Sequence, residues 1–356
     1  RHRVGSTAAI FIGDDESDED AFGTLCGPDA GVKVALLSDQ RTVALVTPSA
    51  RVVWFCVPRV DSPAIFAELL GGPVAGFFAI RAADGSAPLR QAYLGNTCVL
   101  RTDWTDFTVT DYLDCAGGRP FQRAGRTDLV RMVEGRGRIL VEFAPRLDFG
   151  REPTHLRRVE DGLQVDGSLD PIVLRSPGVE WTLSDDGPHQ SAVGEFELAR
   201  GNVVLELRYG VSTAKELVVQ SAQRLEQTKL FWSLWADKLQ VPPVAPDLVR
   251  RSALVLKGLC YGPTGAIVAA ATTSLPEHVG GVRNWDYRYA WLRDAAMAAT
   301  ALARLGSTGT GTRLIDWLLG ILDRDEAPEF FRPVYTVTGG HLGVEAEIRE
   351  LHGYRA

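Results

Sequence analysis

Between residues 32 and 210, apolar and polar positions alternate with the two-residue period of β-strands. Residues 107–113 show the alternation clearly, and the same pattern returns at 139–143, 179–183 and 203–209. Two apolar runs, 42–46 and 51–57, flank Thr47-Pro48-Ser49-Ala50, which is typical of a hairpin turn. Many short strands with few helices between them predict a large β-sandwich.

The hydrophobic period changes near Ser212. Residues 213–239 contain neither Gly nor Pro and are rich in helix-forming residues, so they predict one long helix. The proline-rich segment 240–246 predicts a linker, after which Asp247 is a suitable N-cap for the next helix. Two more helices are expected further along, at 295–305 and 312–323.

Composition narrows the class of protein. The 356 residues are 45 % hydrophobic and carry a net charge of −7, which is typical of a globular protein. Nothing in this balance favours binding to nucleic acid or to an anionic membrane, and no apolar run approaches the ~20 residues of a membrane helix. The five cysteines are dispersed, which predicts reduced, mostly buried thiols in a cytoplasmic protein. The oligomeric state stays open.

The ends of the chain have a separate meaning. The sequence starts at Arg1 rather than Met and stops at Ala356 inside a segment that looks unfinished. We therefore expect a piece of a longer protein.

An acidic cluster lies near the start of the chain. The apolar run 8–12 is followed at once by GDDESDEDAF, residues 13–22, as in the active-site loops of α/β proteins. Like charges this close repel one another, and hard oxygen ligands suit Mg²⁺, so Asp14, Asp15 and Asp18 are candidate metal ligands. The alternative is a solvated acidic turn that caps a helix starting near Glu19.

The same string resembles the last catalytic motif of trehalose-6-phosphate phosphatases of the haloacid-dehalogenase superfamily. The resemblance implies that Asp14 or Asp15 helps to hold Mg²⁺ and that Asp18 acts through water. The nucleophilic aspartate and the Lys-bearing motif of that superfamily have no counterpart in this chain. Residues 1–35 are therefore expected to be the inactive C-terminal remnant of a phosphatase domain, whose intact form requires Mg²⁺.

The richest chemistry lies at residues 280–297. Four aromatic residues alternate with other residues, namely Trp285, Tyr287, Tyr289 and Trp291. In an extended stretch they would share one face and could cover the apolar face of a sugar. Arg293 and Asp294 follow, with groups that bind hydroxyls, and Asp294 is a natural N-cap for the next helix. The alternative is an aromatic core segment with a structural Arg–Asp pair.

The string RNWDYRYAWLRDA resembles the first sugar-binding motif of glycoside hydrolase family fifteen, which contains glucoamylases and bacterial trehalases. Further segments resemble the same family in the same order, at 37–46, 54–63, 265–277 and 351–355. The resemblance implies a super-β-sandwich, a helical linker and a six-fold (α/α) barrel. The expected units are 1–35 for the phosphatase remnant, 36–211 for the sandwich, 212–246 for the linker and 247–356 for an incomplete barrel.

The resemblance also implies roles for single residues. Arg293 and Asp294 would bind the non-reducing glucose in the innermost subsite. The residues implied to line that subsite or its rim are Tyr287, Tyr289, Trp291, Tyr354 and Arg355.

Members of that family invert the anomeric carbon, which needs a carboxylic acid and a carboxylate about 6.5–9.5 Å apart. By resemblance both lie downstream of residue 356, so no catalytic residue is expected in this chain. Solvated positions are the favoured interpretation of the local acidic residues, which are Glu345, Glu347 and Glu350.

The expected function follows from both resemblances. The chain is a fragment of a trehalose-metabolising enzyme whose parent hydrolyses α,α-trehalose or an α-glucan end with inversion. The glycosidase needs no cofactor and is fused to a trehalose-6-phosphate phosphatase. The alternative is a non-catalytic module that binds carbohydrate or docks a neighbouring domain.

Overall fold

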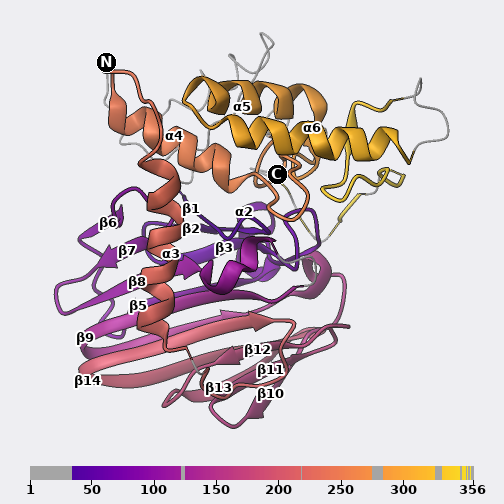
Figure 1. Cartoon of the computed structure of the whole chain (residues 1–356). Helices are drawn as coiled ribbons and strands as arrows, with labels where there is room; N and C mark the ends of the chain where they lie inside the picture. The colour runs from indigo at the N-terminus through magenta and orange to yellow at the C-terminus, as the bar shows by residue number, and fades with distance from the viewer. Residues whose placement is uncertain are drawn as a thin grey trace.

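The structure is a computed structural model that describes residues 34–121, 125–217, 219–274, 284–324, 331–344 and 347–349, together with Leu351 and Gly353. Strands come first and helices follow (Figure 1). The expectation of a mostly β N-terminal part followed by helices is confirmed.

Within the described residues, the β part contains fourteen strands and a short helix α2 (Glu68–Gly71). In chain order the strands are β1 (Ala35–Ser38), β2 (Val43–Val46), β3 (Arg51–Cys56), β4 (Ala64–Phe66), β5 (Phe77–Ala82), β6 (Arg90–Tyr93), β7 (Leu100–Asp103), β8 (Phe107–Leu113), β9 (Thr127–Ala144), β10 (His155–Val159), β11 (Gly162–Asp166), β12 (Ile172–Arg175), β13 (Glu180–Asp186) and β14 (His189–Tyr209). The helical part contains α3 (Ser221–Ala236), α4 (Pro246–Gly258), β15 (Ala290–Trp291), α5 (Leu292–Arg304), α6 (Thr308–Leu322) and β16 (Val334–Tyr335).

Two long strands organise the sheet. The antiparallel pair β9–β14 is continuous from Ala192↔Phe143 to Tyr209↔Thr127, with a register shift between Ala199 and Gly201. On the other side of β9, β8 pairs with its first half and β5 with its second half. One hydrophobic core contains residues from both halves of the sheet, so the sheet folds over on itself with the core between its halves (Figure 1).

This core contains a buried ion pair. Arg131 on β9 and Asp111 on β8 are both fully buried, and Arg131 Nε lies 2.8 Å from Asp111 Oδ1. Arg131 also donates to the carbonyls of Phe78 and Ala50, and its guanidinium lies 4.8 Å from the Phe78 ring centroid. The guanidinium is thus satisfied on every side by groups of the core itself.

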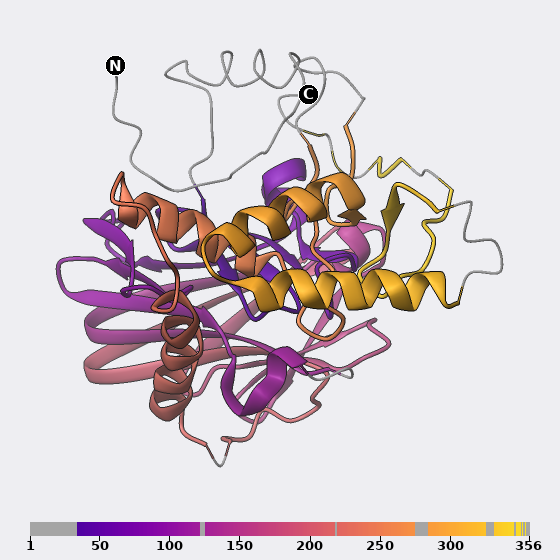
Figure 2. The ribbon, with the colours of Figure 1, turned by 45° about the horizontal axis from the view of Figure 1, so that its top comes forward.

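Helices cover two outer faces of the sheet. A second core combines residues of β1–β3, such as Trp54, with residues of α4, α5 and α6, such as Ala298 and Trp317. Both views show α5 and α6 side by side above these strands (Figures 1 and 2). Helix α3 lies instead on β8, β9 and β14, where Leu225 packs against Tyr112 and Val130.

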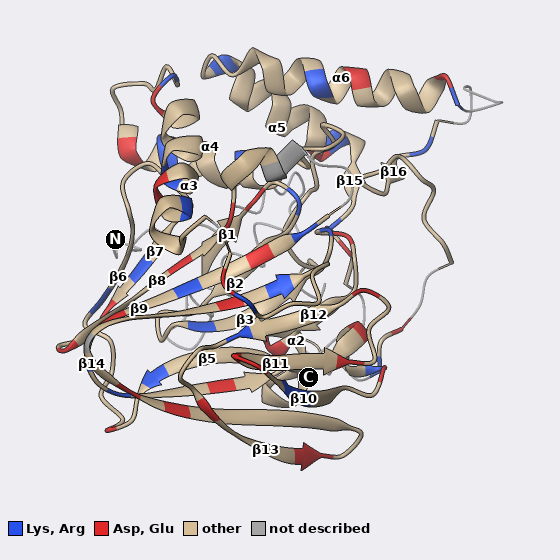
Figure 3. Cartoon of the chain, turned by 60° about the horizontal axis from the view of Figure 1, so that its bottom comes forward, with Lys and Arg blue, Asp and Glu red and all other residues tan. Residues whose placement is uncertain are grey.

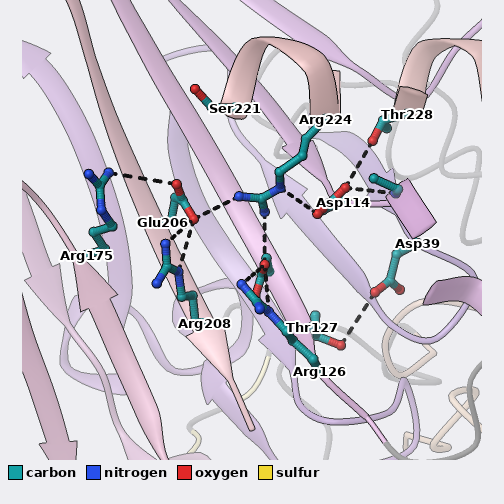
Figure 4. A network of polar contacts seen from close by, with 12 residues as sticks. Asp39, Asp114, Arg126, Thr127, Arg175, Glu206, Arg208, Ser221, Arg224 and Thr228 are labelled. Carbon is teal, nitrogen blue, oxygen red and sulfur yellow. Dashed lines mark hydrogen bonds and ion pairs between the residues drawn. The ribbon is translucent and has the colours of Figure 1, made fainter. Parts of the chain in front are cut away.

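An ion network holds α3 on the sheet (Figure 4). Arg224, in the first turn of α3, donates to three buried carboxylates: Asp114 at 2.8 Å, and Asp128 and Glu206 at 2.9 Å each. Burial alone would lower the pKa of Arg224, but the charges of these carboxylates outweigh it and raise the pKa above its usual value. Arg224 is therefore charged at every pH at which the fold persists.

The start of α3 differs from the sequence expectation. The predicted helix over 213–239 begins only at Ser221, because the preceding residues are held by the sheet. Arg208 on β14 donates to the carbonyl oxygens of Thr213 at 3.0 Å and Lys215 at 2.7 Å. Carbonyls bound in this way do not form the hydrogen bonds of a helix.

The start of α4 also differs. Asp247 was expected to be its N-cap, but the cap is Ala245, which has a left-handed φ of 50° and no capping side chain. Pro246 occupies the first helical position, where its missing amide hydrogen costs nothing. Asp247 lies within the first turn, where a carboxylate is favourable to the helix dipole.

Asp39, between β1 and β2, is a second type of buried acid. Its Oδ1 accepts hydrogen bonds from the amides of Arg41 at 2.8 Å and Thr42 at 2.9 Å. Its Oδ2 accepts a longer bond of 3.4 Å from the Thr127 hydroxyl. Burial raises the pKa of Asp39 to about 6, although these amides and the charge of Arg41 act to lower it.

Charges and thiols agree with the composition. Positive and negative residues are interspersed along strands and helices (Figure 3). The four cysteines within the described part, Cys56, Cys98, Cys115 and Cys260, are free and buried, as predicted. Among the described residues, none of the helices is both long and apolar enough to cross a lipid bilayer.

The Arg224 network predicts a large loss of stability on mutation. Arg224→Ala leaves three buried carboxylates with one positive charge fewer, so we expect the free energy of unfolding to fall by about 3 to 5 kcal/mol. The matched control is Arg136→Ala, which removes an exposed pair with Asp106 whose side chains are 67 % and 48 % accessible. Its expected cost is below about 1 kcal/mol. Urea denaturation of the two variants measures both values, and equal losses would contradict the prediction.

Asp39 predicts a pH-dependent contribution. Its folded-state pKa of about 6 lies above the ordinary 3.8, so its contribution is fully present below pH 3.8 and is lost as the pH rises through 6. Asp39→Asn keeps the acceptor oxygen and removes this titration. When the pH is raised from 4 to 7.5, the free energy of unfolding of the variant should rise by about 2 to 3 kcal/mol relative to that of the wild type. Urea melts at both pH values test this, with the exposed Asp323→Asn as the control that should show no such trend. A pH-independent difference for Asp39→Asn would refute the assignment.

Candidate functional site

The candidate sugar-binding segment, residues 284–294, is held by main-chain hydrogen bonds at both ends. The Ser274 amide donates to the Trp285 carbonyl at 2.7 Å, and the Trp285 amide donates to Ser274 Oγ at 2.8 Å. At the other end β15 pairs with β16, and the Leu292 amide, at the start of α5, donates to the Pro333 carbonyl at 2.9 Å. These hydrogen bonds fix both ends of the segment, which leads into α5.

The aromatic residues do not follow one extended face. The Arg288 amide donates to Asp286 Oδ1 at 3.0 Å, and this local bond turns the chain at Tyr287 and Arg288. The expectation of four rings along one extended face is therefore wrong. Instead, Tyr287 and Trp291 make an edge-to-face contact, with ring centroids 6.0 Å apart and an interplanar angle of 78°. Trp285 is 44 % exposed.

Arg293 and Asp294 lie in the first turn of α5. Arg293 Nη2 is 3.4 Å from Asp294 Oδ2, and the two side chains are 55 % and 15 % accessible. Asp294 is not the N-cap that its sequence position suggested, because α5 begins at Leu292 and Trp291 is its N-cap. A carboxylate in the first turn is stabilised by the helix dipole, and an accessible guanidinium beside it can donate to hydroxyls.

Arg288 is a residue of this segment whose surroundings sequence reasoning did not foresee. It is 5 % exposed, and its Nε lies 2.9 Å from Asp286 Oδ1. Its Nη1 donates to the Ser62 carbonyl and lies 3.5 Å from Cys56 Sγ, so it reaches the β part. Burial works to lower the pKa of Arg288, but the neighbouring groups, with Asp286 among them, raise it. A single cation inside a run of aromatic residues was the signal in the sequence.

The loop between β3 and β4 packs beside this segment, where it accepts the Arg288 hydrogen bond. Arg59 Nε donates to Asp61 Oδ1 at 2.7 Å, and Asp61 Oδ2 accepts from the Val337 amide at 3.1 Å. Burial raises the pKa of the Tyr289 hydroxyl, and the charge of Asp286 adds to the rise. The loop thus contacts both chain segments that flank β15 and β16.

Several candidate residues lie outside the described part of the chain. They are Asp14, Asp15 and Asp18 of the acidic cluster, Tyr354 and Arg355 of the expected rim, and Glu345 and Glu350. Glu347 is described and exposed. Within the described ranges, no group of three or more His, Cys, Asp or Glu residues is placed to hold a metal ion.

A cavity of about 930 Å³ lies elsewhere, between β6 and the start of α4. Its lining includes Tyr93 and Arg251 but no residue of 284–294. Arg251 already donates to the carbonyls of Thr97 at 2.7 Å and Gly95 at 3.1 Å, and its guanidinium lies 3.8 Å from the Tyr93 ring centroid. The polar groups of this cavity are already used to hold α4 on the sheet. We therefore keep segment 284–294 as the candidate site.

Comparison with family models matches nearly the whole chain. A model described as "Trehalase-like, N-terminal" matches residues 26–232, and a model of "Glycosyl hydrolases family 15" matches residues 243–346. The first covers the sheet and most of α3, and the second covers α4 to α6 with segment 284–294.

Curated relatives agree with these matches. The chain is 30 % identical over 321 residues to a trehalase of Thermoplasma acidophilum, covering 87 % of this chain and 53 % of the relative. It is 29 % identical over 347 residues to a trehalase of Mycobacterium tuberculosis, covering 90 % of this chain and 51 % of the relative. The chain spans about half the length of the curated relatives it matches.

Proposed function

The chain belongs to the trehalase-like family, with a glycosyl hydrolase family 15 segment, and we propose that the protein of which it is part hydrolyses the α-glucosidic bond of α,α-trehalose. The observation that carries the proposal is its similarity, over nearly its whole length, to proteins named as trehalases. The alternative substrate, which the same chemistry would hydrolyse, is the end of an α-glucan.

The candidate site supports this proposal. In it, Arg293 and Asp294 bind hydroxyls of the non-reducing glucose, because charge-assisted hydrogen bonds suit the polar edge of a sugar. The paired rings of Tyr287 and Trp291 offer an apolar surface for the face of the sugar, and Tyr289 completes the subsite. Tyr354 and Arg355 are proposed to form its rim.

Hydrolysis with inversion requires an acid and a base that we place outside this chain. On this proposal, the sheet part is a super-β-sandwich and residues 247–356 are the first part of a six-fold (α/α) barrel. The chain by itself then binds sugar without releasing glucose, and the glycosidase needs no cofactor. The free, buried thiols are consistent with work in the reducing cytoplasm.

For the start of the chain we propose a phosphatase remnant that is inactive alone. The support is the sequence GDDESDEDAF, with Asp14, Asp15 and Asp18 as the Mg²⁺ ligands of the intact domain. Phosphate release from trehalose 6-phosphate by this chain, with Mg²⁺ added, is therefore expected to be absent. Release that requires Asp14 would contradict the remnant.

The proposed role of Asp294 predicts a kinetic loss. In the full-length protein, Asp294→Asn should lower kcat/KM for trehalose by about 10- to 100-fold, because a hydrogen bond to a charged group is lost. Glucose release from trehalose measures this. Asp316→Asn, on the exposed side of α6, is the control that should keep wild-type kinetics. A wild-type protein that releases no glucose from trehalose would reject the substrate, and an unaffected Asp294→Asn would reject the site.

A further inference from the structure

We propose that Arg288 is a positioning residue through which the β part of the protein sets the shape of the sugar subsite. The inference rests on the proposed function, because it concerns how the same subsite is built. Arg288 does not touch the sugar. It acts through Asp286 on the rings of Tyr287 and Trp291.

The guanidinium of Arg288 joins two separate parts of the fold. On one side it forms a two-pronged ion pair with Asp286, with Nε–Oδ1 and Nη2–Oδ2 distances of 2.9 and 2.5 Å. On the other side its Nη1 donates to the Ser62 carbonyl in the loop after β3 and contacts Cys56 Sγ. These partners lie more than 220 positions apart in sequence. The planar fork of arginine can satisfy both sides at once, whereas a lysine ammonium cannot.

The β part supplies an aromatic seat for this guanidinium. The Phe149 ring centroid lies 5.1 Å from the Arg288 Cζ atom, and that of Trp54 lies 5.9 Å away. Phe149 reaches this place from a turn in which Asp148 and Phe149 both adopt left-handed backbone angles, with φ of 49° and 61°. Such angles are unfavourable for these residues and persist where the surrounding structure requires them.

The ion pair then transmits this placement to the rings. The Trp291 indole Nε1 donates to the Asp286 carbonyl at 3.3 Å, and the Trp291 and Tyr287 rings are in edge-to-face contact. The main chain of Asp286 is also bridged to Thr273. Any shift of Arg288 therefore moves Asp286, and with it the indole and the tyrosine ring that we assign to the sugar face.

Arg131 is a buried arginine with similar contacts to those of Arg288, but it lies in the core of the sheet, away from the candidate subsite. It too pairs with an aspartate, donates to main-chain carbonyls of a neighbouring strand and turn, and lies over a phenylalanine ring. All its partners belong to the core of the sheet. A substitution of Arg131 therefore reports the cost of disturbing such a buried arginine, without a change at the site.

Steady-state kinetics of the full-length protein test the proposal. Arg288→Lys keeps the charge and loses the fork, so KM for trehalose should rise about 10-fold while kcat changes little, as for lost ground-state and transition-state binding alike. Arg131→Lys should lower the melting temperature to a comparable extent and leave KM unchanged. Should Arg288→Lys not fold, Phe149→Leu keeps the ion pair, removes the ring beneath it and should raise KM about 3-fold. An unchanged KM in the foldable variants would overturn the proposal.

A second measurement does not depend on sugar hydrolysis. In the 356-residue chain labelled with 5-fluorotryptophan, Arg288→Lys should shift or split the ¹⁹F signals of Trp285 and Trp291 and leave those of Trp104 and Trp181 in place. Arg131→Lys should leave the Trp285 and Trp291 signals unmoved. If the wild type hydrolyses no trehalose but the signals move as stated, the proposed function fails and the positioning role stands. Unmoved signals in Arg288→Lys would refute the positioning role whatever the substrate.

Discussion

The contact of one guanidinium with three buried carboxylates fixes the relation between the sheet and the helices. Asp114, Asp128 and Glu206 come from three different parts of the sheet, and as anions in a dry environment they would repel one another. Two of these acids also pair with other arginines of the β part. Arg224 contacts all three acids, and it lies in the first turn of the helix that leads out of the sheet. These three acids are therefore all paired with Arg224 only when α3 lies on the sheet in the position that brings Arg224 to them.

The position of the later helices depends on this contact. Further along α3, on the same side as Arg224, Trp232 and Ala236 pack against two buried cysteines and against Leu254 of α4. The direction of α3 thus sets where α4 begins its path over the sheet, and α4, α5 and α6 share one core with β1–β3. The candidate sugar segment leads into α5, so its position over the sheet follows from the same arrangement.

The sequence predicted those elements whose pattern reflects local burial. The strand predicted at Phe107–Leu113 corresponds to β8 residue for residue, and one of its faces meets the core of the sheet. Its other face is buried as well, because α3 covers Tyr112, and the alternation did not indicate that cover. Helix starts were less predictable, because tertiary contacts decided them. Arg208 holds Thr213 and Lys215 out of α3, and nothing within the local sequence reveals that donor. Arg293 and Asp294 were named as candidates from the residue pattern and from the resemblance, whereas Arg288 depends on Ser62, a partner that only the fold brings near.

The four cysteines of the described chain lie beneath three different contacts. Cys56 touches Arg288, Cys98 and Cys115 lie under α3, and Cys260 follows α4 in the core shared with the helices. A thiol-reactive dye added to the native protein can therefore label each sulfur only when the element above it lifts away. Labelling rates, resolved by peptide mass mapping, would separate the local opening of the site, of the linker helix and of the helical cover, with the native residues themselves as the reporters.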